Sequence, residues 1–122
     1  METVLVVVAP EAGYDVFELL QRHLRGRGWE AYVVPVTEIS RAQLPPVALV
    51  VAHATDWPEE RVGEWLGEVR QAVGRRKPVV AVLPKPPASY PPEVQNLWTR
   101  AFGYGAKLSE VATLVDDMLA GY

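Results

Sequence analysis

Three short runs of consecutive apolar residues, rich in β-branched side chains, constrain the fold of this chain most strongly. They are residues 3–9 (TVLVVVA), 47–52 (VALVVA) and 79–83 (VVAVL). Each run has the length of a β-strand and lacks the alternation of polar and apolar positions that marks a strand with one face in water. A strand without that alternation is buried on both faces, as in the centre of a parallel sheet. The sequence therefore predicts that these runs form three adjacent, parallel, central strands.

A helix is predicted to follow the first of these strands. Asp15 is a suitable N-cap, and Glu18, three residues later, completes a capping box with it. Gly26 and Gly28 are expected to end the helix, because glycine readily adopts the conformation found just beyond a helix. Apolar positions recur at helical spacing and define one face of this helix: Val16, Phe17, Leu20 and Leu24.

A second helix is predicted after the run at 47–52. Asp56 is its expected N-cap, Pro58 occupies the first helical position and Glu59 completes a capping box. Gly74 is expected to end it. Its apolar residues recur at steps of three and four, which predicts a wide face packed on the sheet: Val62, Trp65, Leu66, Val69, Ala72 and Val73.

Further elements are predicted between and after these helices. Residues 31–36 (AYVVPV) have the composition of a strand, and Pro35 favours a place at the edge of the sheet because it cannot donate a ladder hydrogen bond. A short, clipped helix is expected over residues 37–44. Residues 85–92 are predicted to form a stiff proline-rich loop.

The C-terminal third is predicted to contain two more helices. One includes Val94, Leu97, Trp98 and Ala101, and the last begins at Ser109 as its N-cap. The segment between them, residues 102–106, contains two glycines and is either a short fifth strand or a loop.

The alternation of strands and helices predicts the fold class. It implies right-handed crossovers and helices on both faces of a parallel sheet. With Pro35 at the edge, the strand order 2-1-3-4-5 is favoured. A length of 122 residues suits one domain. We therefore expect residues 1–122 to form a single α/β domain with a three-layer, flavodoxin-like (Rossmann-like) fold and a parallel sheet of four or five strands.

Composition excludes several classes of function. The net charge is −3 and the basic residues form no stripe, so nucleic acid is not an expected partner. No apolar run is long enough to span a membrane. The absence of cysteine excludes thiol chemistry and indicates a cytoplasmic protein. The single asparagine, Asn96, and the preference for arginine over lysine suggest a heat-adapted source.

Motifs for cofactors and metals are also absent from the sequence. Neither GxGxxG nor GxxxxGK[ST] occurs, which argues against a dinucleotide or P-loop site. The only histidines are His23, which is expected to be structural or exposed, and His53, and no set of potential ligands has the spacing of a metal site. We therefore expect neither a cofactor nor a metal.

Polar residues that follow the predicted central strands are the candidate ligand-binding residues. In an open parallel sheet, ligands bind beyond the carboxyl ends of the strands, near the point where the strand order reverses. Glu11 follows the first strand, His53 and Thr55 follow the third, and Lys85 follows the fourth. Lys85 favours an anionic group, and an unperturbed histidine titrates near neutral pH.

Each of these residues also has a structural interpretation. Asp15 and Asp56, in the same loops, are expected to cap helices. His53 is alternatively a partly buried histidine at the end of a strand, and Lys85 alternatively a solvated side chain. The sequence leaves both interpretations open.

Element order and two sequence stretches resemble response-regulator receiver domains. The stretches are VLVVVAPEA and VALVVAHATDWPEERVGEWLGEVRQ…KPVVAVL. The resemblance implies a phosphoacceptor aspartate after the third strand, an acidic pair after the first, a hydroxyl after the fourth and a lysine after the fifth. The chain instead has Ala9-Pro10, Ala52-His53-Ala54 and Leu83-Pro84, and only Lys107 stands for the lysine. Without those carboxylates, Mg²⁺ binding and phosphate transfer are not expected.

The C-terminal half is similar to TIR-like domains of flavodoxin fold. The matching residues are EVRQA at 68–72, KPVVAV at 77–82 and the prolines at 91–92. Some TIR-like domains cleave NAD with the glutamate of this pattern, so the resemblance implies a catalytic role for Glu68.

Two functions are consistent with these observations. The favoured hypothesis is a non-catalytic regulatory or protein-interaction domain of receiver-like fold that lacks phosphorylation chemistry and binds a protein partner or a second copy of itself as a homodimer. Trp29, Trp57 and Trp98 at the ends of predicted elements supply candidate contact surface. The alternative is a small nucleotide-binding or NAD-cleaving enzyme.

Overall fold

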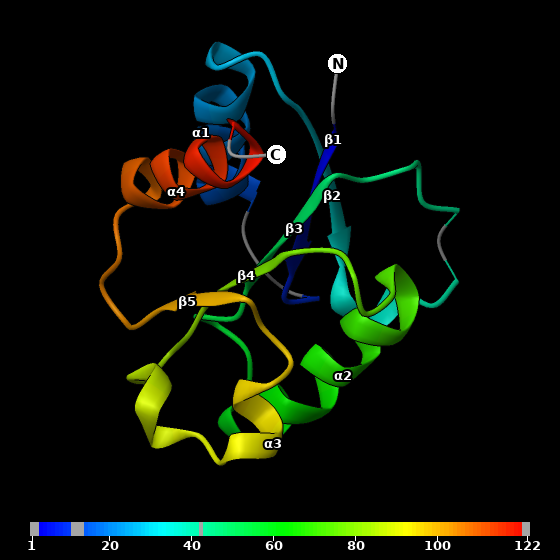
Figure 1. Ribbon diagram of the computed structural model, residues 1–122, viewed down its shortest axis with the longest axis vertical. Coiled ribbons are helices and arrows are strands. Elements are labelled where there is room, and N and C mark those ends of the chain that lie inside the picture. The colour runs from blue at the N-terminus through cyan, green and yellow to red at the C-terminus, as the bar shows by residue number, and fades with distance from the viewer. Residues whose placement is uncertain (1–2, 11–13, 42, 121–122) are drawn as a thin grey trace.

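Five parallel strands form one sheet in the computed structural model, which describes residues 3–10, 14–41 and 43–120 (Figure 1). The strands are β1 (Thr3–Val8), β2 (Glu30–Pro35), β3 (Leu49–His53), β4 (Val79–Val82) and β5 (Arg100–Phe102). Their order is β2-β1-β3-β4-β5, so the predicted order 2-1-3-4-5 is confirmed.

The three apolar runs lie side by side at the centre of the sheet, as predicted. Val6 of β1 pairs in parallel with Val51 of β3, and Val51 pairs in parallel with Val80 of β4. All three side chains are fully buried. The continuous apolar character of these runs therefore corresponds to burial on both faces of the sheet.

Strand β2 lies at the edge of the sheet, where Pro35 predicted it. Its partner is β1, and Pro35 is in register with Val8 at the end of the ladder. Tyr32 and Glu30 on this strand are exposed. The missing backbone donor of proline therefore costs no hydrogen bond inside the sheet.

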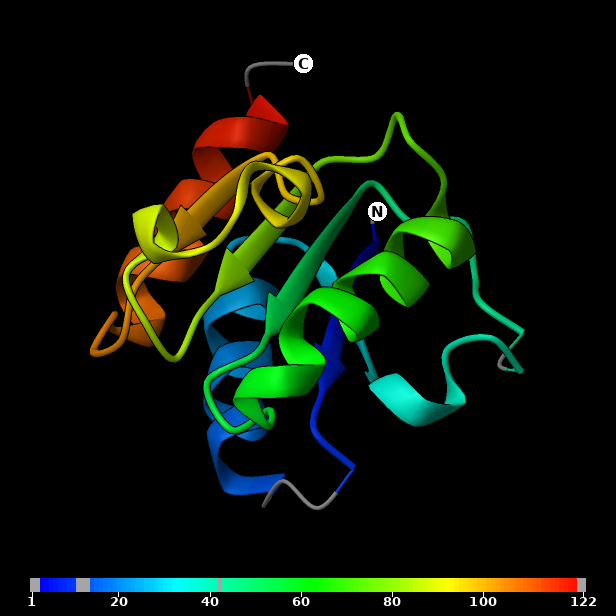
Figure 2. The same cartoon turned by 90° about the horizontal axis from the view of Figure 1, so that it is seen from below.

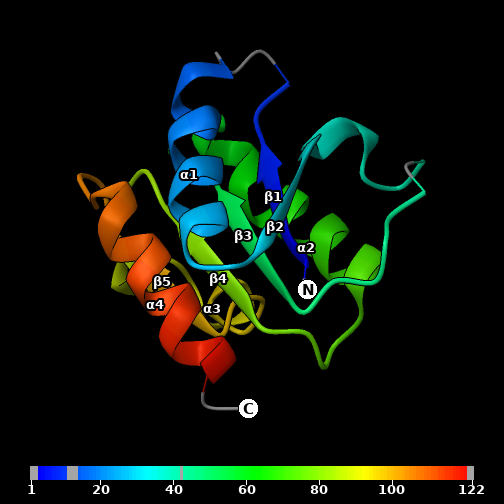
Figure 3. The ribbon, with the colours of Figure 1, turned by 90° about the horizontal axis from the view of Figure 1, so that it is seen from above.

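Helices cover both faces of the sheet. Helices α1 (Tyr14–Gly26) and α4 (Leu108–Ala120) pack on one face, and α2 (Val62–Val73) packs on the other (Figures 2 and 3). The short helix α3 (Pro92–Gln95) lies on the same side as α2. The arrangement is the three-layer, flavodoxin-like α/β fold that the sequence predicted. None of the helices in the described residues is long and apolar enough to cross a membrane.

Several predicted helix starts are wrong. Helix α1 begins at Tyr14, so Asp15 lies inside it, and α4 begins at Leu108, so Ser109 lies inside it. The chain after β3 forms a 3₁₀ turn, η2 (Glu59–Arg61), before α2 begins at Val62.

The delayed start of α2 has a local cause. Trp57 is 3% exposed, and its backbone N–H donates to the carbonyl of Ala54, which closes a turn that buries the indole. Pro58 is then extended (φ −55°, ψ 134°), and no side chain caps the following 3₁₀ turn. Burial of Trp57 therefore prevents Asp56 from acting as the predicted cap.

The other end of α2 follows the prediction. Gly74 ends the helix with φ 90°, and Gly28 beyond α1 has φ 91°, a region that favours glycine. On the face of α2 toward the sheet, Leu66 and Val69 are buried and Trp65 is half-buried. Ala72, which the periodicity placed on this face, is exposed.

The predicted helix that included Val94 and Ala101 is shorter than expected, because α3 ends at Gln95, a turn follows and β5 begins at Arg100. Next to β5, the backbone N–H of Thr99 donates to the carbonyl of Val79 (2.8 Å). The hydroxyl of Thr99 in turn accepts from the backbone N–H of Val79 (3.0 Å). These bonds extend the sheet to β5, which ends at Phe102. Of residues 102–106, only Phe102 is therefore in a strand, and the rest form a loop. The clipped helix predicted over 37–44 is the single turn η1 (Val36–Glu38).

Candidate functional site

The rim at the carboxyl ends of β1, β3 and β4 is lined mainly by apolar groups. Ala9 follows β1, Ala54 follows β3 and Leu83 follows β4, and all three are buried. The backbone N–H of Ala54 donates to the carbonyl of Val82 (2.8 Å), and that of Leu83 donates to Phe102 (2.9 Å). The positions closest to the strand ends therefore pack and pair instead of presenting polar side chains.

His53 and Thr55 lie together at this rim. His53 is the last residue of β3, and the Thr55 hydroxyl lies 3.4 Å from each ring nitrogen, which is long for a hydrogen bond. Burial lowers the pKa of His53 below its usual range, and the nearby Asp56 carboxylate offsets part of that effect. At neutral pH the imidazole is therefore predominantly uncharged.

Lys85 is held by neighbours within the chain. Its Nζ forms an ion pair with the carboxylate of Glu59 in η2 and lies 5.9 Å from the centre of the Tyr90 ring. Among the predicted site residues, His53 and Thr55 thus lie near each other, and Lys85 contacts Glu59. The fourth predicted residue, Glu11, lies outside the described residues.

A small cavity opens at the rim beside these residues. It has a volume of about 250 Å³ and is lined by Ala9, Pro10, Asp56, Pro58 and Trp65. Asp56 is the one carboxylate among the described residues of this lining. Mg²⁺ sites in proteins combine one or two carboxylates with the phosphates of a substrate. Among the described residues, no three histidine or acidic side chains gather into a possible metal site.

Two aromatic pairs lie on the α2 side of the sheet. Trp57 and Trp65 meet edge to face with ring centres 5.5 Å apart, and Tyr90 and Trp98 do so at 5.8 Å. Burial raises the pKa of the Tyr90 phenol. The expectation that Trp57 offers contact surface is wrong, because the T-shaped contact and the core enclose it. Trp29 and Trp98 are half-buried.

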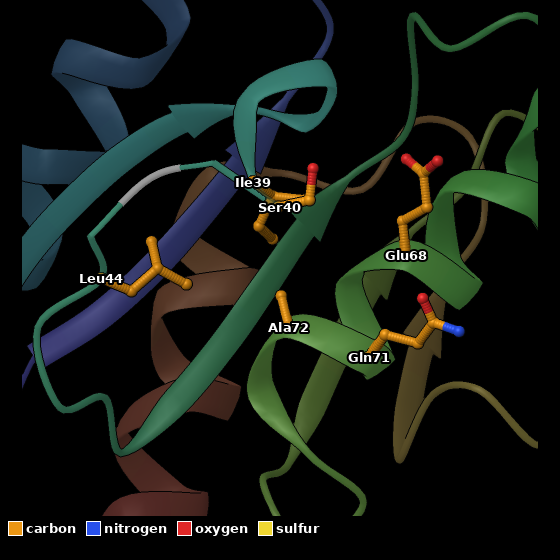
Figure 4. A pocket seen from close by; sticks show the side chains of 6 residues that line it. All are labelled: Ile39, Ser40, Leu44, Glu68, Gln71 and Ala72. Carbon is orange, nitrogen blue, oxygen red and sulfur yellow. The ribbon is translucent and has the colours of Figure 1, made fainter.

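A groove lies away from the rim, between α2 and the segment that follows η1. It has a volume of about 510 Å³, and its lining is Ile39, Ser40, Leu44, Glu68, Gln71 and Ala72. Figure 4 shows the Ser40 hydroxyl and the Glu68 carboxylate extending in the same direction from opposite walls. Glu68 was singled out from the sequence, whereas Ser40 was missed because its position depends on the short turn that replaces a longer helix.

A second groove flanks the other side of α2. Its volume is about 420 Å³, and it is lined by Gly67, Arg70, Gln71, Gly74, Arg75 and Leu97. The Arg70 guanidinium donates to the carbonyls of Lys77 (2.6 Å) and Leu97 (3.1 Å), which ties the end of α2 to the chain around it. Gln71 lines both grooves.

Comparison with known proteins gives matches among solved structures. No protein-family model matches the chain, and no curated protein does. The response regulator TrrA from Thermotoga maritima matches with a TM-score of 0.71 and 18% identity, over 97% of this chain and 99% of its own. A chain in the complex of TrrA with the histidine kinase ThkA matches with a TM-score of 0.72 and 17% identity, over 98% of this chain and 99% of its own.

A receiver domain protein from Methanospirillum hungatei has a TM-score of 0.67 and 10% identity, over 99% of this chain and 95% of its own. The chain has the receiver-domain fold. These likenesses cover both halves of the chain, and they give no support to the TIR-like resemblance of the C-terminal half. Within the receiver fold, Lys107 is exposed and lies five residues beyond the end of β5, directly before α4.

Proposed function

We propose that this chain is a non-catalytic regulatory or protein-interaction domain that uses the receiver fold without phosphorylation chemistry. The observation that carries the proposal is the set of residues at the carboxyl ends of the central strands. Ala9, Ala54 and Leu83 are buried there, and His53 is held uncharged by burial. We further propose that it acts as a single, cytoplasmic domain from a heat-adapted source.

The charges near the rim also support this proposal. Phosphoryl transfer to a carboxylate requires a divalent cation to offset the charge of the phosphate. Among the described residues that line the rim cavity, Asp56 is the one carboxylate, and the Glu59 carboxylate is engaged by Lys85. The site therefore lacks a partner carboxylate for Asp56 among the described rim residues.

A phosphorylation assay tests the proposal. The chain is incubated with acetyl phosphate and Mg²⁺, and its intact mass is measured together with that of an Asp56→Asn control. We expect both masses to remain unchanged. A gain of one phosphoryl group that maps to Asp56 in the native chain and is absent from the control would overturn the proposal.

A second candidate function rests on the groove beside Glu68. Its volume of about 510 Å³ and the presence of Ser40 and Glu68 in its lining offer room and polar groups for a nucleotide-like ligand, or for NAD cleavage with Glu68 as the catalytic carboxylate. At the rim, Glu11, His53, Thr55 and Lys85 remain the proposed ligand-binding residues.

Thermal unfolding in the presence of nucleotides separates these possibilities. A ligand that binds the native state raises the melting temperature by mass action. A shift lost in Lys85→Ala indicates the rim, and NAD consumption lost in Glu68→Ala indicates the groove. If no nucleotide shifts the melting temperature and no NAD is consumed, both ligand sites are excluded.

A further inference from the structure

The outward side of α2 is a polar helix face that lies between two grooves. We define the outer face of α2 as four residues of the helix and one residue beyond each of its ends: Glu60 in η2, Glu64, Gly67, Glu68 and Gln71 in α2, and Arg75 after Gly74. Most of these side chains are exposed, while Val62, Leu66 and Val69 on the opposite side are buried. The grooves of about 510 and 420 Å³ meet along this face at Gln71.

Charge is divided along this face. The amino-terminal half, with its preceding turn, carries Glu60, Glu64 and Glu68 together with Arg61, which forms an ion pair with Glu64 (3.2 Å). The carboxyl-terminal half is followed by Arg75 and Arg76. These side chains are all exposed. A helix with one acidic and one basic half is complementary to an antiparallel copy of itself, because each acidic half then faces a basic half.

The middle of the face leaves space for close approach. A Cβ atom built on Gly67 has no neighbour within 4 Å, whereas one built on Gly63 lies 3.1 Å from Val94 Cγ2. The packing of α3 thus accounts for Gly63, whereas no neighbour among the described residues accounts for Gly67. Gln71, one turn further on, carries both a donor and an acceptor, so it can bond to a polar side chain of a second copy.

We propose that the outer face of α2 is the surface through which two copies of this chain associate, with the two α2 helices antiparallel across a twofold axis. In this arrangement Glu68 of each copy faces Gln71 of the other, and Glu64 faces Arg75. The grooves on either side of α2 receive the side chains of the second copy. The inference deepens the proposed function, on which its regulatory meaning rests, by naming the partner and the surface.

Sedimentation equilibrium over a range of protein concentrations measures the oligomeric state and tests this inference. The native chain is expected to form a dimer. Gly67→Leu is expected to be monomeric and to remain folded, because the added side chain enters open space within the chain and blocks only the second copy. Folding of this variant is checked by circular dichroism.

Reversing the charges of Glu64 and Arg75 tests the proposed contact between them. Glu64→Arg or Arg75→Glu alone should raise the dimer dissociation constant about tenfold, because each places like charges together twice in the dimer. The double variant should recover most of that loss, and Glu110→Arg on α4 should have no effect. A native chain that is monomeric throughout, a Gly67→Leu dimer, or a double variant no tighter than the single ones would overturn the inference.

The outcome is independent of phosphorylation. A monomeric chain that accepts no phosphoryl group overturns the dimer and leaves the proposed function in place. A dimer that becomes phosphorylated at Asp56 overturns the proposed function and leaves the dimer in place.

Discussion

The rim of the sheet and the outer face of α2 differ in where they place their polar groups. At the rim, the positions next to the strand ends are buried, apolar and paired through the backbone, as Ala54 and Leu83 show. On the outer face of α2, charged side chains are exposed beside two grooves. The fold thus provides a location for ligand chemistry at the strand ends, whereas the residues of this chain favour contacts on a helix.

The largest expected effect tests whether the rim belongs to the packed core or forms a polar ligand site. Ala54→Asp should destabilise the fold by about 3–5 kcal/mol, because it places an uncompensated charge where the side chain is fully buried. Ala72→Asp, at an exposed position on α2, is the matched control and should cost less than about 1 kcal/mol. Urea denaturation measures both, and an equally mild effect at Ala54 would show that the rim accepts a carboxylate.

The next effect concerns the inner side of α2. Leu66→Ala should reduce the free energy of unfolding by about 2–5 kcal/mol, the usual cost of emptying a fully buried leucine site. Glu68→Ala, two residues away on the exposed side, should change it little. Equal losses from the two variants would contradict the assignment of inner and outer sides.

A smaller effect should depend on pH at the rim. Because the pKa of His53 is lowered in the folded state, the unfolded chain binds more protons below about pH 6.5. The contribution of His53 to stability is therefore fully present above that pH and is lost as pH falls toward its folded pKa. In His53→Gln the denaturation midpoint should depend less steeply on pH between about pH 5 and 8. An unchanged dependence on pH would show that His53 does not cause the effect. Exposed His23→Gln is the control.

The smallest effect distinguishes a structural from a ligand-binding role for Lys85. Lys85→Met removes a half-exposed ion pair with Glu59 and should cost about 0.2–1 kcal/mol. A Glu59→Gln variant should cost a similar amount, and the double variant should cost less than the sum of the two. Additive losses would mean that the two side chains do not interact in solution.

Much of the fold could be predicted because burial leaves a direct trace in the sequence. The three apolar runs were sufficient to place the central strands. Pro35 placed the edge strand, and Gly74 placed the end of α2. The start of α2 could not be predicted, since it depends on the burial of Trp57 against residues distant in the chain. Propensity also failed at Thr99, where hydrogen bonds to Val79 favour a strand over a helix.

The candidate site was predicted less completely, because polar contacts between loops leave no local pattern. The proximity of His53 and Thr55 follows from two residues on one strand end. The partner of Lys85 is Glu59, 26 residues earlier, and no local signal pairs them. The two grooves beside α2 could not be predicted, because one depends on where the segment with Ser40 lies and the other on where Leu97 lies beside the helix.

Pro35 bears on how copies of this chain avoid joining in the wrong way. An unprotected edge strand offers backbone donors and acceptors to any other extended chain, which is the first step toward amyloid-like stacking. At the end of β2, Pro35 withholds a donor, and the charge of Glu30 lies at the other end of the same strand. The two residues make continuous edge-to-edge addition at β2 unfavourable, so aggregation through this edge is suppressed while the helical surfaces stay available.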